Sequence, residues 1–226
     1  MQTGQVVIFI FDSMEKIIPV SPPNCGWIEV RLSEQEIDHL WKCIETSEKK
    51  DIKKILAGNI SESYTIKDID DYFFNNVIIP VGRSFENEFF SISSKIPTNK
   101  AHSLFLKDLW VNYQRKNEFN PIHLHTGVYS FVVWLKIPTD SNEENQKKIA
   151  LDSSCPSIGV FEFVYTNILG GIEQQKYYLN KNYEGTMIFF PSDLRHQVYP
   201  FYDSDELRIS ISGNILLDSE SHYDTN

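Results

Sequence analysis

The sequence is poor in cysteine, lacks long apolar runs and has fewer basic than acidic residues. Its three cysteines are widely spaced and form no Cys-x-x-Cys pair, so we expect plain thiols rather than a zinc or redox motif. The longest apolar runs, such as Phe131–Leu135, are far shorter than the ~20 residues of a membrane helix. The first residues also lack the basic and apolar segments of a secretory signal. We therefore expect a soluble, cytoplasmic protein with no membrane partner.

The excess of negative charge limits the partners. With 21 Lys and Arg against 31 Asp and Glu, the formal net charge is −10, which repels the phosphates of nucleic acids. We therefore expect a small-molecule or peptide substrate rather than a nucleic acid. Apolar residues make up 41% and charged residues 23% of the chain, which excludes intrinsic disorder. No repeat or linker is evident, so residues 1–226 are predicted to form a single domain.

The N-terminal half has helical patterns. Ser33 and Glu36 form a capping-box signature, which predicts the start of an amphipathic helix over residues 34–50. The apolar face of this helix comprises Ile37, Leu40, Trp41 and Ile44. Weaker helical patterns cover Lys67–Phe74 and Val81–Ser94. Residues 1–103 are accordingly predicted to form a mainly helical support.

From Leu104 onward, short segments rich in β-branched and aromatic residues alternate with Gly, Pro and Asn, which indicates strands. The expected strands are Leu109–Gln114, Tyr129–Ile137, Gly159–Thr166, Gln175–Leu179, Thr186–Phe190 and Arg208–Ile215, with Trp27–Arg31 as a further candidate. The fold class is therefore α+β, mainly β, with a sandwich or barrel over 104–216 and a polar tail over 217–226. The polar interruption Thr139–Ser157 is long for an internal loop, and we expect a lid, a binding loop or disorder there.

Three of the six histidines are candidates for one metal site. His123 and His125 precede a predicted strand, and their i, i+2 spacing points both imidazoles to one face of an extended chain. His196 follows another predicted strand, which could bring it within reach of the pair. Neutral imidazole suits Fe, Zn, Cu or Ni, so residue type alone does not choose the metal. Surface positions are expected for the other three histidines, His39, His102 and His222.

The last predicted strand has one polar face. Arg208, Ser210, Ser212 and Asn214 alternate with isoleucines, and exposure to water would explain the serines and the asparagine. A guanidinium soon after His196 could instead enter the same cavity and bind a carboxylate through two hydrogen bonds. Ser210 would add a hydroxyl donor on the same face. Three metal ligands beside an Arg/Ser pair would suit an enzyme that anchors a dicarboxylate at a metal.

The order and spacing of these residues resemble the 2-oxoglutarate- and Fe(II)-dependent oxygenase superfamily. In that family a ligand pair on one strand precedes a distal histidine and then an arginine that binds 2-oxoglutarate. The resemblance runs from about Leu109 to Asn214. It is closest to prolyl 4-hydroxylase-like oxygenases of phages and marine bacteria, which carry segments similar to 118–125 and 190–200. It implies a jelly-roll (double-stranded β-helix) core, the cofactors Fe(II), 2-oxoglutarate and O₂, and location in the host cytoplasm if the chain is viral.

The resemblance also implies roles for individual residues. His123 and His196 match the two histidine ligands of the family. Arg208 matches the partner of the far carboxylate of 2-oxoglutarate, and Ser210 matches a second donor to it. Tyr113, ten residues before His123, stands where relatives carry a tyrosine that hydrogen-bonds 2-oxoglutarate, with a core position as an equal alternative.

Two positions depart from the family pattern. The usual second ligand is Asp or Glu, where this chain has His125. Loss of that negative charge raises the reduction potential of the iron and weakens Fe(II) binding. Three arrangements are open: His125 ligates, a carboxylate such as Asp108 or Glu118 replaces it, or the position is vacant as in related halogenases. Trp134 stands where relatives often have another tyrosine, so it can only shape the pocket.

The expected activity is hydroxylation of a substrate C–H bond, with release of succinate and CO₂ and a peptidyl or prolyl substrate as the first guess. Asn120, Tyr129 and the Thr139–Ser157 loop are candidates for substrate contact. A cupin dioxygenase or isomerase is a rival, although cupins usually place a glutamate soon after the histidine pair, where this chain has Val-Tyr-Ser-Phe. A three-histidine zinc hydrolase and a non-enzymatic jelly roll, structural or carbohydrate-binding, are further rivals.

Overall fold

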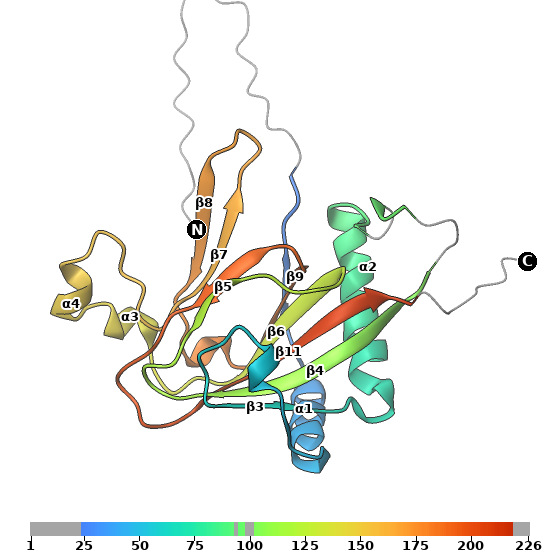
Figure 1. The fold of residues 1–226 in the computed structure, drawn as a ribbon, viewed down its shortest axis with the longest axis horizontal. Coiled ribbons are helices and arrows are strands. Elements are labelled where there is room, and N and C mark those ends of the chain that lie inside the picture. Colours follow the sequence, from blue (N-terminus) through green and yellow to red (C-terminus); the bar gives the residue numbers. More distant parts are fainter. Residues whose placement is uncertain (1–23, 93–94, 98–101, 219–226) are drawn as a thin grey trace, which may run out of the picture.

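Two facing antiparallel β-sheets form the centre of the fold (Figure 1). A computed structural model describes residues 24–92, 95–97 and 102–218. Within these ranges, the larger sheet has the strand order β1 (Ile28–Arg31), β9 (Thr186–Pro191), β6 (Tyr129–Lys136), β11 (Arg208–Leu217), β4 (Leu104–Gln114), β3 (Glu62–Thr65), β2 (Lys50–Asp51). The smaller sheet has the order β5 (Asn120–His123), β10 (Arg195–Val198), β7 (Phe161–Thr166), β8 (Ile172–Tyr177). Figure 1 shows β7 and β8 as a hairpin that extends beyond the rest of the smaller sheet.

The helices are short. The two main ones are α1 (Glu34–Thr46) and α2 (Ile79–Glu88), and α2 continues a π-helical segment, η3 (Phe74–Ile78). The remaining helical segments are η1 (Lys53–Ile55), η2 (Ile69–Asp71), α3 (Ser141–Glu144), α4 (Lys148–Leu151) and η5 (Lys181–Tyr183). The apolar residues of α1, η3 and α2 join the outward-facing residues of the larger sheet in one buried cluster. Each fully buried large apolar side chain there contributes about 1.5–3 kcal/mol.

The strands from β4 to β11 alternate between the sheets except at the hairpin of β7 and β8, and this order identifies the topology. Strands β4, β6, β9 and β11 belong to the larger sheet, and β5, β7, β8 and β10 belong to the smaller sheet. The last strand, β11, pairs antiparallel with the first, β4, along its length. This arrangement is a double-stranded β-helix, or jelly roll, and the predicted fold class is confirmed. The N-terminal segment adds β1 to β9, as the Trp27–Arg31 pattern predicted, and β3 and β2 beyond β4.

Local signals set the limits of α1. The Ser33 side chain accepts a hydrogen bond from the Glu36 amide, and the Glu36 carboxylate accepts one from the Ser33 amide, so the predicted capping box is present. The helix ends at Thr46 rather than at residue 50. It stops earlier because Lys50 and Asp51 pair with β3 as a strand.

The expected helix over Lys67–Phe74 is present only in part. The segment contains the 3₁₀ turn η2, inside which Asp70 has a positive φ of 56°, and continuous helix begins only at Tyr72. The Asp68 carboxylate accepts hydrogen bonds from the Phe73 and Phe74 amides, and this capping starts the continuous helix. The helix expected over Val81–Ser94 therefore begins earlier, and it ends at Glu88; residues 93–94 lie outside the described ranges.

The sequence pattern missed β2, β3, β5 and β10 and placed β8 too late along the chain. Each of the missed strands has four residues or fewer, too few to show a period of two. The polar interruption at Thr139–Ser157, expected to be a lid, a binding loop or disordered, contains the short helices α3 and α4, which bury Ser141, Glu144 and Ala150. The predicted polar tail lies mostly outside the described residues, because β11 extends to Leu217 and the description ends at residue 218.

Candidate metal centre

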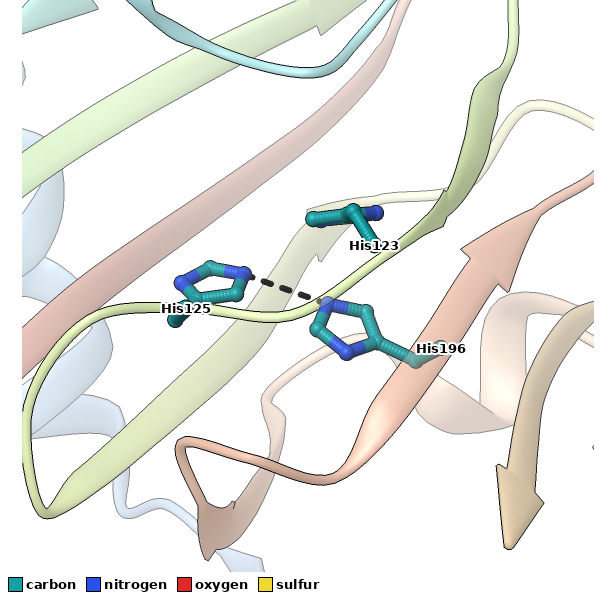
Figure 2. A group of neighbouring side chains, drawn as sticks. All are labelled: His123, His125 and His196. Carbon is teal, nitrogen blue, oxygen red and sulfur yellow. Dashed lines mark hydrogen bonds between the residues drawn. The ribbon is translucent and has the colours of Figure 1, made fainter.

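The pairing of β5 with β10 brings the three candidate histidines together. His123, the last residue of β5, is the register partner of His196 on β10, and His125 follows two residues after β5 (Figure 2). The Nε2 atoms of His125 and His196 are 3.2 Å apart. One nitrogen of each of the three rings lies within 4.8 Å of the others. The smaller sheet therefore gathers the three imidazoles that the sequence pattern selected.

The second nitrogen of each ring faces a hydrogen-bond acceptor. Nδ1 of His123 lies 2.8 Å from the Pro121 carbonyl, and Nδ1 of His196 lies 3.0 Å from the Leu194 carbonyl. Nδ1 of His125 lies 2.8 Å from Oδ1 of Asn214. Acceptors at all three positions place the proton on Nδ1 and leave a lone pair on each Nε2. Two lone pairs facing each other at 3.2 Å repel unless a cation lies between them, so the site fits a metal ion.

Burial keeps these imidazoles neutral. Desolvation lowers the pKa of His125 from 6.5 to about 4 and lowers the pKa of His196 well below 6.5, with the neighbouring histidines adding to the effect. The pKa of His123 is lowered by desolvation as well. The Trp110 ring stacks on His125 with centroids 5.6 Å apart. Neutral imidazole is the form that ligates a metal, so the three rings are ready to bind one near neutral pH.

The polar face of β11 points to the same cavity as the histidines. The register pairs Arg208 with Gln114 and Ser210 with Asn112, so these four side chains share the inner face of the larger sheet. All four line one cavity together with the three histidines. The polar alternation of this strand therefore faces a buried site rather than water.

Arg208 is a buried cation with an unused donor. Its Nη2 donates to the Gly159 carbonyl at 3.0 Å, its Nη1 lies 3.5 Å from Oε1 of Gln114, and its Nε has no hydrogen-bond partner. The guanidinium lies over the Phe201 ring. No carboxylate in the described part of the chain forms an ion pair with it at 4 Å or less. Burial lowers the pKa of Arg208 to about 10, so it is still charged at neutral pH. A carboxylate ligand would satisfy both the charge and the free donor.

Glu144 lies behind this arginine and was missed in the sequence. It is 2% exposed, and its Oε1 accepts hydrogen bonds from the Tyr202 and Asp203 amides, while its Oε2 has no partner. The negative charge of Glu144 raises the pKa of Arg208 and so partly offsets the effect of burial. Glu144 is one of four acidic residues from 140 to 152, and no pattern in the sequence marks it as the buried one.

Two aromatic candidates lie on the wrong side of the larger sheet. Tyr113 alternates with Asn112 and Gln114 on β4, so it points outward, contacts Tyr64 and packs against the helix-facing core. Tyr129 is fully buried in the same core and donates a hydrogen bond to Glu86. The expected contacts of Tyr113 with 2-oxoglutarate and of Tyr129 with substrate are therefore wrong, because the distance along the chain does not fix the face of a strand.

The other candidates are distributed as follows. Trp134 is buried and lines the shared cavity, as does Asn120, whose Oδ1 is buried without a partner. The carboxylate of Asp108 accepts a hydrogen bond from Asn214, and that of Glu118 accepts from the Ser61 and Arg115 amides. Neither carboxylate belongs to the described group of histidine nitrogens.

The surface positions expected for His39 and His102 are not observed. His39 is largely buried and pairs with Asp68 at 2.8 Å. His102 is half-buried, and its Nδ1 lies 2.9 Å from the Asp218 carbonyl. Both were misassigned because the sequence shows the polarity of a residue but not its packing partner. His222 lies outside the described residues.

Comparisons with known proteins bear on the family and the fold. A family model described as "Putative 2OG-Fe(II) oxygenase" matches residues 108–214, the segment that carries all three histidines and Arg208. The sequence resemblance to the 2-oxoglutarate/Fe(II)-dependent oxygenase superfamily is therefore supported over this segment of the chain. That family uses Fe(II), 2-oxoglutarate and O₂. No curated protein sequence matches the chain significantly.

Solved structures share the fold at low sequence identity. A 2OG-Fe(II) oxygenase family oxidoreductase from Burkholderia pseudomallei has a TM-score of 0.53 at 13% identity, covering 84% of this chain and 85% of that one. The non-heme α-ketoglutarate-dependent epimerase SnoN from nogalamycin biosynthesis has a TM-score of 0.52 at 12% identity, with 85% and 78% covered. HygX from Streptomyces hygroscopicus, with nickel and 2-oxoglutarate bound, has a TM-score of 0.50 at 10% identity, with 84% and 82% covered. Within the described residues, no helix is long and apolar enough to span a membrane.

Proposed function

We propose that this protein is an Fe(II)- and 2-oxoglutarate-dependent dioxygenase that hydroxylates a C–H bond of a small molecule or peptide, with a peptidyl or prolyl substrate as the first candidate. The observation that carries the proposal is the shared cavity. One side holds three neutral imidazoles with convergent nitrogens, and the other holds a buried arginine with a free donor. A metal and a dicarboxylate together satisfy both halves of the cavity. When bound, iron and 2-oxoglutarate supply the activation of O₂ that oxidises the substrate, with succinate and CO₂ as products.

In this proposal His123, His125 and His196 hold the iron. The Asn214 amide keeps the His125 ring oriented and its Nδ1 protonated, as a carbonyl does for each of the other two rings. Three neutral ligands leave the full +2 charge on Fe(II), whereas a carboxylate ligand would reduce it to +1. This charge favours a dianionic chelator such as 2-oxoglutarate.

Arg208 binds the far carboxylate of 2-oxoglutarate in this proposal, and Ser210 donates a second hydrogen bond to it. Arg208 is held in place by the Gly159 carbonyl, by Gln114 and by the Phe201 ring. The walls between the metal and the arginine are apolar and include Val132, Trp134 and Phe161. These side chains exclude water from the reaction site, which strengthens the interaction of Arg208 with a carboxylate.

The proposed substrate enters from a neighbouring hollow beside His123 and His125. This hollow has a volume of about 230 Å³. Its wall combines the apolar Ile55, Leu56 and Leu124 with the polar Asn120. The wall therefore suits an aliphatic group flanked by a hydrogen-bonding group, which a peptide provides.

Anaerobic titration of the Fe(II)-loaded protein with 2-oxoglutarate tests the proposal. Chelation of iron by the keto acid is expected to produce a weak visible charge-transfer band. Arg208→Ala is expected to weaken 2-oxoglutarate binding by 100-fold or more, since a buried charge-assisted pair is lost. The exposed Arg195, next to His196 on β10, supplies the matched control, and Arg195→Ala should leave the titration unchanged.

The outcomes separate the rival functions. Iron binding without the band would exclude the 2-oxoglutarate site and favour a cupin-type enzyme. Absence of metal binding would exclude the metal centre and leave a non-enzymatic jelly roll. His125→Ala separates the ligand arrangements, because a ligating His125 predicts a large loss of iron affinity, whereas a vacant position predicts little change.

A further inference from the structure

A second group of metal-ligating side chains lies away from the cavity, between α1 and the segment that precedes η3. His39 and Cys43 are one helical turn apart on α1, and Asp68 faces them from the turn before η2. Nε2 of His39 lies 2.8 Å from Oδ1 of Asp68 and 3.2 Å from Sγ of Cys43. The three ligand atoms all lie within 4.8 Å of one another. This Cys/His/Asp cluster takes no part in the proposed oxygenase chemistry.

The geometry excludes a catalytic triad. A catalytic triad requires the thiol at one imidazole nitrogen and the carboxylate at the other. Here both groups contact the same atom, Nε2 of His39. Cys43 is also fully buried, so no substrate reaches it. One nitrogen, one sulfur and one carboxylate oxygen that converge on a point form a ligand set instead.

The distances are close to those of a tetrahedral metal site. Metal–nitrogen and metal–oxygen bonds of about 2.0 Å and a metal–sulfur bond of about 2.3 Å place the donors roughly 3.3–3.6 Å apart. The observed separations of 2.8 and 3.2 Å are shorter by about half an ångström or less. Small side-chain shifts would therefore admit the ion, with no change in α1.

The surroundings hold the ligands in place. The Asp68 carboxylate accepts hydrogen bonds from the Phe73 and Phe74 amides at 3.0 and 2.8 Å, and these bonds leave lone pairs free for a metal. The Tyr72 ring packs on His39 with centroids 4.6 Å apart. Asp70 and Asp71 both adopt positive φ, which is costly for residues other than glycine and fixes the turn that presents Asp68.

We propose that His39, Cys43 and Asp68 bind a Zn²⁺ ion, with solvent as the fourth ligand on the side where His39 is 13% exposed. A thiolate combined with an imidazole and a carboxylate suits Zn²⁺ rather than a hard cation such as Mg²⁺. The ion ties α1 to the turn before η3 and so clamps two elements that cover the outer face of the larger sheet. This site goes beyond the proposed function and does not depend on it.

Cobalt(II) binding distinguishes this site from the three-histidine centre. A cysteine ligand gives Co²⁺ an intense near-ultraviolet sulfur-to-metal band, and the three-histidine centre contains no sulfur. The full chain carrying His123→Ala and His196→Ala removes competition from that centre. This variant is expected to bind one Co²⁺ per chain with the sulfur band, and added Zn²⁺ should abolish the band.

Variants of single residues assign the ligands. In the same background, Cys43→Ser should abolish the band, whereas Cys25→Ser and Cys155→Ser, which alter the other two cysteines, should leave it intact. His39→Gln provides a second variant if Cys43→Ser does not fold, and it should lower the Co²⁺ affinity at least tenfold. Absence of the sulfur band, its survival in Cys43→Ser, or its loss in Cys155→Ser would each overturn the proposal. The first outcome would leave His39 and Asp68 as a structural pair.

Discussion

Strands β4 and β11 present different chemistry to the two sides of the larger sheet. Outward-facing residues are apolar and pack against the helices; they include Val111, Tyr113, Ile209, Ile211 and Ile215. Inward-facing residues of the same strands are polar and line the cavity; they include Asn112, Gln114, Arg208, Ser210 and Ser212. The outer face contributes stability through apolar burial, and the inner face holds partly unsatisfied polar groups that a ligand can complete. We therefore expect outer-face substitutions to change stability and inner-face substitutions to change binding.

The largest expected difference between the two faces of the larger sheet comes from two neighbouring residues of β11. Ile211→Ala should lower the free energy of unfolding by about 2–5 kcal/mol, because it leaves a cavity in a fully buried core. Ser212→Ala, one position along and facing inward, should change it by about 0.5 kcal/mol or less. Denaturant unfolding of both variants measures the difference. Equal losses would show that the two faces are not specialised.

The next largest effect is expected from a substitution of Asn214. Asn214→Leu removes the acceptor at Nδ1 of His125 and should lower the metal affinity about 10- to 100-fold. Asn214→Asp retains an acceptor and should keep most of the affinity. Competition with a chromophoric chelator gives both constants, and far-ultraviolet circular dichroism checks that both variants fold. An unchanged affinity in Asn214→Leu would contradict the orienting role of this amide.

The pH dependence of stability is a smaller test of the inner face. In the metal-free protein, His125 stays neutral down to a pKa of about 4, whereas it titrates near 6.5 when unfolded. The unfolded state therefore binds more protons below pH 6.5, and the free energy of unfolding should fall as the pH drops from 6.5 toward 4. Each histidine whose pKa is lowered in this way adds up to about 1.4 kcal/mol per pH unit to the slope of the free energy of unfolding against pH. His125→Asn should make the slope shallower, and a slope that does not change would contradict the burial of a neutral imidazole.

The smallest expected effect comes from two adjacent residues of β4. Gln114→Ala removes an acceptor of Arg208 and should weaken 2-oxoglutarate binding severalfold. Tyr113→Phe removes a hydroxyl on the opposite face and should change that binding less than twofold. The iron-chelate band measures both. A larger effect of Tyr113→Phe would restore the tyrosine to the site and contradict the assignment of faces.

The sequence predicts the parts of the site that depend on local spacing. The i, i+2 histidine pair, the later histidine and the arginine at the start of an alternating strand are local patterns, and the structure brings their side chains to one cavity. The α1 capping box and the helix face are also local. These features were predictable because neighbours along the chain determine them.

The features that were missed depend on contacts between distant segments. Tyr113 was assigned to the site because a ten-residue spacing does not specify which face of β4 it occupies. His39 was assigned to the surface because its partner Asp68 belongs to another element. Glu144 acts on Arg208 only because the fold brings both side chains close to Gly159. Such residues become visible only when the tertiary fold places the elements together.

The pairing of His123 with His196 also has a consequence for folding kinetics. Strands β5 and β10 are far apart in the sequence, so their contact forms only after a costly loop closure, whereas the local turns of α1 form early. An ion bound to both histidines bridges this late contact. A metal ion bound there should slow the separation of β5 from β10 more than it accelerates folding. Metal binding would then lower the unfolding rate of the jelly roll.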